Sequence, residues 1–279
     1  MPELPEVETV RSDLRPSLTG RRLVGVVATG QRSLRRLGGP GPLVEATLGA
    51  TVRGVDRHGK YLLVRLDRPE VLVVHLGMSG QLRLVDPSAA EIPHTHVRWR
   101  LDNGSELCFV DPRTFGEVFV AHSGPGASRL PVELAHLGPD ALDGIGGPAS
   151  LARRLEGHRR RIKPVLLDQR VVAGIGNIYA DEILWASRIA PDRPAGGLSP
   201  GELRRLRVAL RSVLLAAIEH RGSSIADRQY RDLSGAVGGH QLHHQAYGRE
   251  GLACGRCGEP IRRVREYGRS TFSCPRCQR

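Results

Sequence analysis

The sequence lacks any long hydrophobic run, and this absence argues against a membrane-spanning helix. Hydrophobic residues make up 40% of the 279 positions, as in ordinary globular proteins. No stretch approaches about 18 uninterrupted apolar residues, the length that would suggest a span. Residues 1–6 are acidic and contain no apolar segment, so they do not look like a secretory signal. The protein is therefore expected to be cytoplasmic. Its length suggests one large or two ordinary domains, and the sequence has no internal repeats.

Acidic residues are in the minority. There are 29 Asp and Glu against 41 Lys and Arg, which gives a formal net charge of +12. An excess of this size indicates a polyanionic partner, most simply nucleic acid, whose affinity would fall with added salt. The alternative is a basic protein from an organism whose proteome is rich in arginine, and charge alone does not separate the two.

Cysteine is scarce, and four of the five cysteines form two Cys-x-x-Cys pairs near the C-terminus, with 16 residues between the pairs. Four thiolates at this spacing can complete a tetrahedral shell around one zinc ion and leave no position open for water. The site is therefore expected to hold one structural Zn²⁺; two disulfides are the alternative. The predicted ligands are Cys254, Cys257, Cys274 and Cys277. Cys108 lies in an apolar run and is expected to be a small buried residue.

The order of elements predicts an α+β protein. A helix is expected over residues 5–15, ended by Pro16, followed by short apolar strands over 21–120 that suggest a sandwich or barrel. Helices are then expected over 149–156, 162–168, 177–187 and from Ser199 to about residue 221, the last opened by a Ser199–Glu202 capping box. Residues 223–248 have no clear periodicity and are interpreted as a mobile loop.

Several motifs resemble those of the formamidopyrimidine-DNA glycosylases, the bacterial 8-oxoguanine glycosylases. The resemblance covers nearly the whole chain, and the motifs occur in the family's order. Each motif alone is a modest signal, whereas the ordered set is highly specific. The motifs are PELPEVE at residues 2–8, GKY at 59–61, HLGMSG at 75–80, DPRTFG at 111–116, GIGNIYADE at 174–182, YGR at 247–249 and the cysteine pairs.

The resemblance implies an N-terminal β-sandwich with flanking helices and a C-terminal helix-two-turn-helix domain that carries a zinc-binding β-hairpin. The expected division is 1–124 for the catalytic sandwich domain, 125–147 for a linker, 148–222 for the helix-two-turn-helix domain, 223–248 for a lesion-capping loop and 249–279 for the zinc finger. The implied partner is double-stranded DNA containing damaged bases, so the protein would be associated with the nucleoid, and it would act as a monomer.

The resemblance also implies the chemistry. Once Met1 is removed, the secondary amine of Pro2 would attack the anomeric carbon of the sugar and form an iminium ion, an electron sink that allows β,δ-elimination. Glu3 matches the general acid of the family. Lys60 matches the lysine that contacts the lesion nucleotide, and Arg269 matches the arginine assigned to δ-elimination. Glu6 and Glu182 are expected to support the site, although carboxylates at a helix N-terminus are also favoured by the helix dipole.

The remaining matched residues are expected to contact DNA. A buried base must be flipped out, and the space it leaves must be filled. Met78, Arg113 and Phe115 match the void-filling residues; without the resemblance, Met78 and Phe115 would be interpreted as core residues. The other candidates, at matched positions or close to them, are His94, Asn177, His158 and Arg159. His158 stands near the place where the family has a lysine, which weakens that match.

Two other functions compete with this hypothesis. One is the sister glycosylase that removes oxidised pyrimidines, and the other is a zinc-dependent lesion-binding protein without activity. Leu4, Val7, Met78 and Phe115 favour the purine enzyme over its sister. His240 stands where an aromatic residue often follows the glycines of the capping loop, so lesion preference is the least determined property. His243 and His244 follow, but no carboxylate or cysteine accompanies them, which argues against a second metal site.

Overall fold

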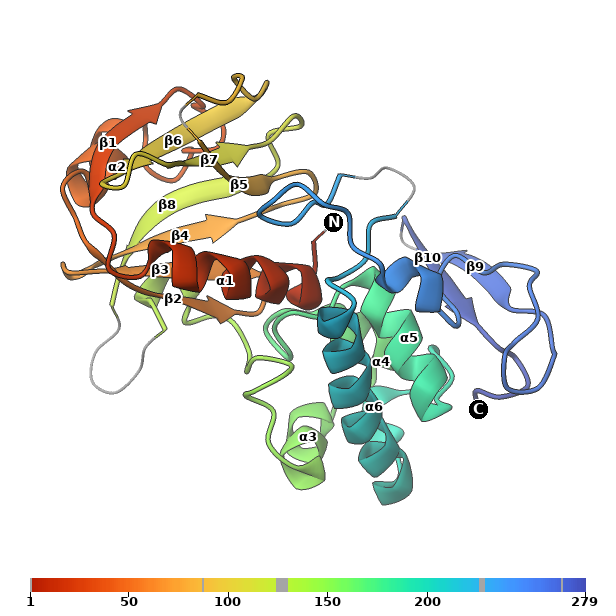
Figure 1. The fold of residues 1–279 in the computed structure, drawn as a ribbon. Helices are drawn as coiled ribbons and strands as arrows, with labels where there is room; N and C mark the ends of the chain where they lie inside the picture. The colour runs from red at the N-terminus through yellow and green to blue at the C-terminus, as the bar shows by residue number, and fades with distance from the viewer. Residues whose placement is uncertain (1, 87, 124–129, 226–228, 267) are drawn as a thin grey trace. The chain divides into compact units, whose positions relative to one another are not determined.

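The computed structural model describes residues 2–86, 88–123, 130–225, 229–266 and 268–279. They form two compact units (Figure 1). The first unit comprises residues 1–136 and 220–239, and the second comprises 137–219 and 240–279. The chain thus returns to the first unit after the long helix of the second. The predicted capping loop is divided between the two units at residues 239 and 240.

The first unit contains two four-stranded antiparallel sheets, as in the predicted sandwich. One sheet has the strand order β1-β6-β7-β5 and the other has the order β2-β3-β4-β8. Its elements are α1 (Leu4–Leu18), β1 (Leu23–Ala28), α2 (Gly41–Thr47), β2 (Val52–His58), β3 (Tyr61–Leu66), β4 (Glu70–His75), β5 (Gln81–Val85), β6 (Thr95–Leu101), β7 (Glu106–Val110), β8 (Glu117–His122) and η1 (Val132–Leu134).

Apolar side chains from both sheets and from α1 form one core. Leu62 and Val74 come from one sheet, Trp99 and Phe109 from the other, and Leu14 from the helix, and all five are buried. Strands rich in Val and Leu that are bounded by turns favour such a packed interior. Cys108 on β7 is buried as expected, and burial raises the pKa of its thiol, so it has the properties of a small apolar residue.

Helix α1 is longer than predicted, because Pro16 does not end it. The helix continues to Leu18, and its C-terminal cap, the N–H of Thr19, donates to the carbonyl of Arg15. Proline lacks one backbone donor, but its fixed φ is compatible with a helix, so a proline in the last turn removes one hydrogen bond without reversing the chain. The α1 helix packs on β2 and β3, which fixes where the N-terminus lies in this unit.

The second unit is helical and ends in a two-stranded hairpin. Its elements are α3 (Pro148–Leu155), α4 (Ile162–Leu167), α5 (Asn177–Ser187), η2 (Ala195–Gly197), α6 (Pro200–Glu219), η3 (His240–His243), β9 (Arg262–Glu266) and β10 (Arg269–Ser273). The capping box forms, since Ser199 and Glu202 exchange backbone and side-chain hydrogen bonds. The α6 helix ends at Glu219, earlier than predicted, and Arg221 and Gly222 adopt positive φ beyond it.

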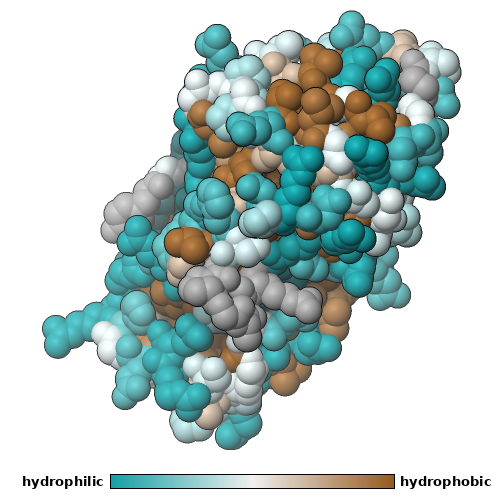
Figure 2. Space-filling model, turned by 90° about the vertical axis from the view of Figure 1, so that its left-hand side faces the viewer, coloured by the Kyte–Doolittle hydropathy of each residue, from teal (hydrophilic) through white to brown (hydrophobic). Residues whose placement is uncertain are grey.

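On the face drawn in Figure 2, hydrophilic residues cover most of the area, and hydrophobic residues gather in separate patches. Among the described residues, no helix combines the length and apolar character that crossing a bilayer would require. Part of the predicted 125–147 linker, residues 125–129, lies outside the described residues, and Val132–Leu134 within it form a short 3-10 turn.

Candidate functional site

The N-terminus of α1 holds the predicted nucleophile and general acid in a buried position. Pro2 and Glu3 are both buried. Glu3 is the N-cap residue, and Glu3 and Glu6 form a reciprocal capping box in which the Glu6 carboxylate accepts from the Glu3 N–H at 2.8 Å. The other Glu6 oxygen accepts from the Ser223 N–H at 2.7 Å. Glu6 therefore ties the reactive end of the chain to the segment that returns after α6. Met1 lies outside the described residues.

Lys60 lies in the turn between β2 and β3 and is buried, with only 7% of its surface exposed. The turn requires Gly59, whose φ is +56°. Across the sheet, Tyr61 pairs with His75, and their ring centroids are 4.6 Å apart. Burial, with the nearby Lys60 charge, lowers the pKa of His75 to about 4. His75 was missed as a candidate, although it begins the HLGMSG motif.

Two short loops of the first unit present the three predicted void-filling side chains. Met78 and Phe115 are 36% and 45% exposed, so their interpretation as core residues is wrong. Arg113 is also exposed, and its guanidinium donates to the Met78 carbonyl at 3.3 Å. Arg113 and Arg32 each lie 5.9 Å from the centroid of the Phe115 ring. An exposed apolar wedge beside cations suits insertion between bases better than packing in a core.

His94 is exposed and adopts a φ of +63° just before β6. Its carbonyl accepts from the N–H of Asp111, the residue that begins the loop bearing Arg113 and Phe115. Asp111 thus connects three segments of the first unit. These segments carry its four candidate DNA-contacting residues, which are Met78, His94, Arg113 and Phe115.

In the second unit, α5 begins at Asn177 as predicted, with Gly176 as its N-cap. The Asn177 side chain donates to the Ser270 carbonyl of β10 at 3.0 Å, so it joins the start of the helix to the finger hairpin. Arg269, the first residue of β10, is exposed. The start of α5 and the predicted arginine of the hairpin are therefore brought together within one unit, where amide groups and a cation suit a phosphate.

A cavity of about 950 Å³ in the second unit is lined by the segment 159–161, by α4 and by the hairpin. Arg159 and Arg269 both line it. Their neighbours Arg160 and Arg161 form ion pairs with Asp168 and Glu266. His158 is half-buried and does not line the cavity; its carbonyl accepts from the Gly196 N–H. Arg159 is therefore better placed than His158 to meet an anion at this surface.

A buried ion pair joins α4, α5 and the hairpin. Lys163 Nζ lies 2.7 Å from the Asp181 carboxylate and also donates to the Ser270 carbonyl and to Thr271 Oγ1, each at 2.9 Å. Asp181 accepts from the Phe272 N–H at 3.0 Å. Burial raises the pKa of Asp181 and the Lys163 charge opposes that shift. Sequence reasoning missed this pair, because a buried charge pair shows no pattern in the sequence.

Glu182 and His240 contribute to the packing of the second unit. The Glu182 carboxylate accepts three backbone N–H groups, from Gln245 and Ala246 at 2.9 Å and from Tyr247 at 2.8 Å. It therefore shapes the segment that leads into the finger. His240 is buried, with its ring centroid 6.0 Å from that of Tyr179 and 5.6 Å from that of His244. The His240 ring thus packs at the position where, by the family resemblance, an aromatic residue often stands.

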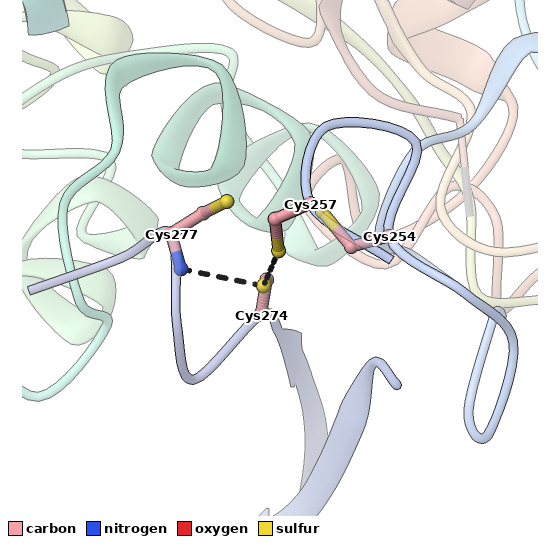
Figure 3. Close-up of side chains that lie close together, drawn as sticks. All are labelled: Cys254, Cys257, Cys274 and Cys277. Atoms are coloured by element: carbon pink, nitrogen blue, oxygen red, sulfur yellow. Dashed lines mark hydrogen bonds between the residues drawn. The ribbon is translucent and has the colours of Figure 1, made fainter. Parts of the chain in front are cut away.

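The four predicted metal ligands converge. Ligand atoms of Cys254, Cys257, Cys274 and Cys277 all lie within 4.8 Å of one another, and the sulfurs of Cys257 and Cys274 are 3.5 Å apart (Figure 3). All four cysteines are free thiols, so the alternative of two disulfides is wrong. Gly258 has a φ of +76° and donates to the Cys254 carbonyl, which closes the turn after the first pair. Four sulfur donors at this spacing fit a tetrahedral zinc ion.

Trp185, near the C-terminal end of α5, connects that helix to the cysteine cluster. Its indole N–H donates to Cys254 Sγ at 3.3 Å, and the Arg256 guanidinium lies 4.1 Å from the centroid of its ring. Asn177, Asp181, Glu182 and Trp185 each bond to the finger or to the segment leading into it. Helix α5 therefore supplies several of the contacts that position the finger, together with Lys163 of α4.

Three family profiles match successive parts of the chain, and these parts contain the sites described above. They are the formamidopyrimidine-DNA glycosylase N-terminal domain over residues 1–118, the H2TH domain of the same enzymes over 137–229, and the zinc finger found in FPG and IleRS over 251–279. Curated relatives carry the same family name: the formamidopyrimidine-DNA glycosylase of Herpetosiphon aurantiacus is 45% identical over the full length of both chains. The chain belongs to the formamidopyrimidine-DNA glycosylase family.

Other comparisons agree with this membership. The formamidopyrimidine-DNA glycosylase of Moorella thermoacetica is 48% identical over 95% of each chain. The crystal structure of the MutM (Fpg) protein from Thermus thermophilus has a TM-score of 0.86 and 42% identity, covering 99% of this chain and 98% of that one. A point mutant of the Lactococcus lactis FPG, in complex with Fapy-dG containing DNA, has a TM-score of 0.86 and 32% identity over all of both chains. The predicted family and fold class are thereby confirmed.

Proposed function

We propose that this protein is a bifunctional base-excision-repair enzyme, which removes oxidised purines from duplex DNA and then cleaves the strand at the resulting abasic site. The observation that carries the proposal is the buried Pro2–Glu3 pair at the start of α1, in a chain of this family. One related MutM structure is in complex with carbocyclic 8-oxo-G containing DNA, and the Lactococcus lactis structures include Fapy-dG DNA. Both lesions are oxidised purines.

The roles of the residues follow from their chemistry. Attack by the Pro2 amine on the anomeric carbon breaks the bond to the base, and cleavage of the bond to the sugar ring oxygen then gives an iminium ion. Its positive charge makes the neighbouring sugar proton acidic. Loss of that proton expels the 3′ phosphate, and a second elimination expels the 5′ phosphate. Glu3 protonates the sugar ring oxygen as the base leaves. Lys60 assists β-elimination and Arg269 assists δ-elimination.

The remaining residues bind or support. Met78, His94, Arg113, Phe115, Asn177 and Arg159 contact DNA, with a smaller part for His158. Glu6 and Glu182 hold the segments that carry the reacting groups. One zinc ion bound by the four cysteines fixes the finger, and because its ligand shell is closed it takes no part in the chemistry. We expect a monomer that works in the cytoplasm on nucleoid DNA.

An oxidised pyrimidine is a second candidate substrate class, because one related Lactococcus lactis structure is in complex with DNA containing such a base. The discriminating measurement compares single-turnover excision of 8-oxoguanine, a formamidopyrimidine and an oxidised pyrimidine, each opposite its normal partner. Faster excision of the pyrimidine would overturn the purine assignment. Binding without excision of any of the three would favour a lesion-binding protein.

The nucleophile is tested by trapping. Processed protein is incubated with duplex DNA that contains one 8-oxoguanine opposite cytosine, and borohydride is added to reduce the iminium ion. We expect a covalent protein–DNA band and strand cleavage with the wild type and neither when Met1 is retained. Pro2→Gly should give much less of both, because its primary amine forms an imine that is not permanently charged. Pro16→Ala is the matched control, since Pro16 is exposed in the last turn of the same helix. Undiminished product from Pro2→Gly would exclude Pro2 as the nucleophile.

A further inference from the structure

A buried carboxylate joins the loops that carry the proposed DNA-opening residues. Asp111, which follows β7, has no exposed surface. One carboxylate oxygen accepts from the Ser79 hydroxyl and from the Arg113 N–H at 3.3 Å, and the other accepts from the Gly116 N–H at 2.6 Å. Its side chain therefore bonds to both of the loops that present Met78, Arg113 and Phe115.

The backbone of Asp111 reaches a third segment. Its N–H donates to the His94 carbonyl at 3.0 Å, and its own carbonyl lies 2.8 Å from His96 Nε2. The positive φ of His94 places the carbonyl of an exposed residue against a buried one. All four DNA-contacting candidates of the first unit thus lie in segments that bond to Asp111.

The two loops also touch directly. A Cβ atom at Gly77 would lie 2.5 Å from the Gly116 nitrogen and from the Phe115 carbonyl carbon, and the φ of Gly77 is +61°. A Cβ atom at Gly116 would lie 2.7 Å from the Phe109 ring in the core. No side chain fits between the loops, so a shift of one displaces the other.

Base flipping requires the inserted side chains to be held in place beforehand. Extruding a base costs a few kcal/mol, which the protein recovers only if these side chains are already positioned. Met78 and Phe115 are exposed, so their positions depend on the loops that carry them. A buried carboxylate with both oxygens bonded stiffens the groups around it, because each lost bond would leave a buried polar atom unsatisfied.

We propose that Asp111 is a positioning residue for duplex opening, which holds three loops in the geometry that Met78, His94, Arg113 and Phe115 need in order to fill the space left by the flipped base. It does not touch DNA, because it is fully buried. The inference rests on the proposed function. It adds that the opening of the duplex and the chemistry at Pro2 depend on separate groups.

The test compares two substrates that differ in whether the helix must be opened. The first is duplex DNA with 8-oxoguanine opposite cytosine, and the second is a single strand with an abasic site, which needs neither flipping nor void filling. For Asp111→Asn, we expect single-turnover excision from the duplex to fall by about 100-fold. Cleavage and borohydride trapping of the single strand should stay within about twofold of wild type, since they do not use the loops.

Two further variants keep the test decisive. Ser79→Ala removes one donor to the same carboxylate and should show the same selective loss at a smaller size, including where Asp111→Asn does not fold. Asp86→Asn is the matched control: Asp86 is exposed and bonds to Ser88 within its own turn, so both reactions should be unchanged. Equal losses on both substrates, or no loss on the duplex, would overturn the positioning role.

A fluorescence measurement separates this inference from the proposed function. With 2-aminopurine placed next to the lesion, wild-type binding should raise the emission as the stack opens, and Asp111→Asn should bind with a smaller rise. If the wild type excises nothing, the proposed function fails, and this signal still tests the positioning role. An undiminished rise with Asp111→Asn would overturn the role.

Discussion

The N-terminal sandwich and the C-terminal finger are stabilised by different means. The sandwich encloses buried side chains from two four-stranded sheets and from α1. In the finger, the buried cluster consists of Ala246, Ile261 and Phe272 with two of the cysteines. Every residue of β9 is exposed. A segment this small cannot bury enough apolar surface to order its backbone, so a metal must supply the missing free energy.

The finger also depends on bonds that the sandwich does not need. Its backbone is held by Asp181, Lys163 and Asn177, and the segment before it is held by Glu182. These side chains come from α4 and α5, whereas the sheets of the sandwich bond mainly to themselves. A core fixes many residues at once, and point contacts fix only those that they touch. The position of the hairpin that carries Arg269 therefore depends on a few side chains.

The largest expected effect comes from removing zinc. Cys274→Ser or a strong chelator should abolish the ordered finger, because structural zinc contributes on the order of 10 kcal/mol to folding in such modules. Hydrogen exchange should show loss of protection over residues 251–279 and unchanged protection in β2, β3 and β4. Cys108→Ala, which changes the cysteine outside the cluster, should leave the zinc content unchanged. If the finger stays protected after zinc is removed, the finger does not depend on the metal for its stability.

A truncation in the sandwich core should destabilise the sandwich and leave the finger ordered. Leu62 is fully buried, so Leu62→Ala should lower the free energy of unfolding by about 2–5 kcal/mol, through lost burial and the cavity that is left. Denaturant unfolding should measure the lowered free energy of unfolding, and hydrogen exchange should locate the lost stability in the sandwich. The zinc content should be unchanged. Val27→Ala is the control, since Val27 is 62% exposed. Zinc release by Leu62→Ala would show that the two regions are not energetically separate.

The smallest effect is an acid response in the second unit. Burial lowers the pKa of His244 from 6.5 to about 4, so the folded protein keeps this ring neutral while the unfolded chain binds a proton below pH 6.5. The stability that His244 contributes is therefore complete above pH 6.5 and is lost as pH falls toward 4, by at most about 3 kcal/mol.

The quantity to measure is the difference in unfolding free energy between the wild type and a variant. A difference is needed because the zinc thiolates also take up protons in acid. Unfolding free energies of the wild type and His244→Leu are compared from pH 7.5 to 4. The difference should change in favour of the variant as pH falls. His243→Gln, on the exposed side of the same turn, should follow the wild type. Parallel curves for the wild type and His244→Leu would contradict a buried neutral His244.

Much of the fold and some of the site could be predicted from local patterns. The strands, the Asn177 helix start and the Ser199–Glu202 cap depend on neighbours in sequence, and they were found. The cysteine spacing predicted the cluster of four cysteines for the same reason. The prediction that Pro16 ends the first helix was wrong, because the helix continues beyond it to Leu18. Met78 and Phe115 would have been assigned to the core from hydrophobicity alone, since an exposed apolar wedge has the same composition as a buried one.

By itself, the sequence determined the fold class, the family and the cluster of four cysteines, because these follow from periodicity, motif order and spacing along the chain. Tertiary structure alone decided that residues 220–239 return to the first unit, that Asp181 pairs with Lys163, and that Asp111 joins three loops. Such contacts join residues far apart in sequence. Their free energy comes from burial, and a buried charge or acceptor has no signature until the chain has folded around it.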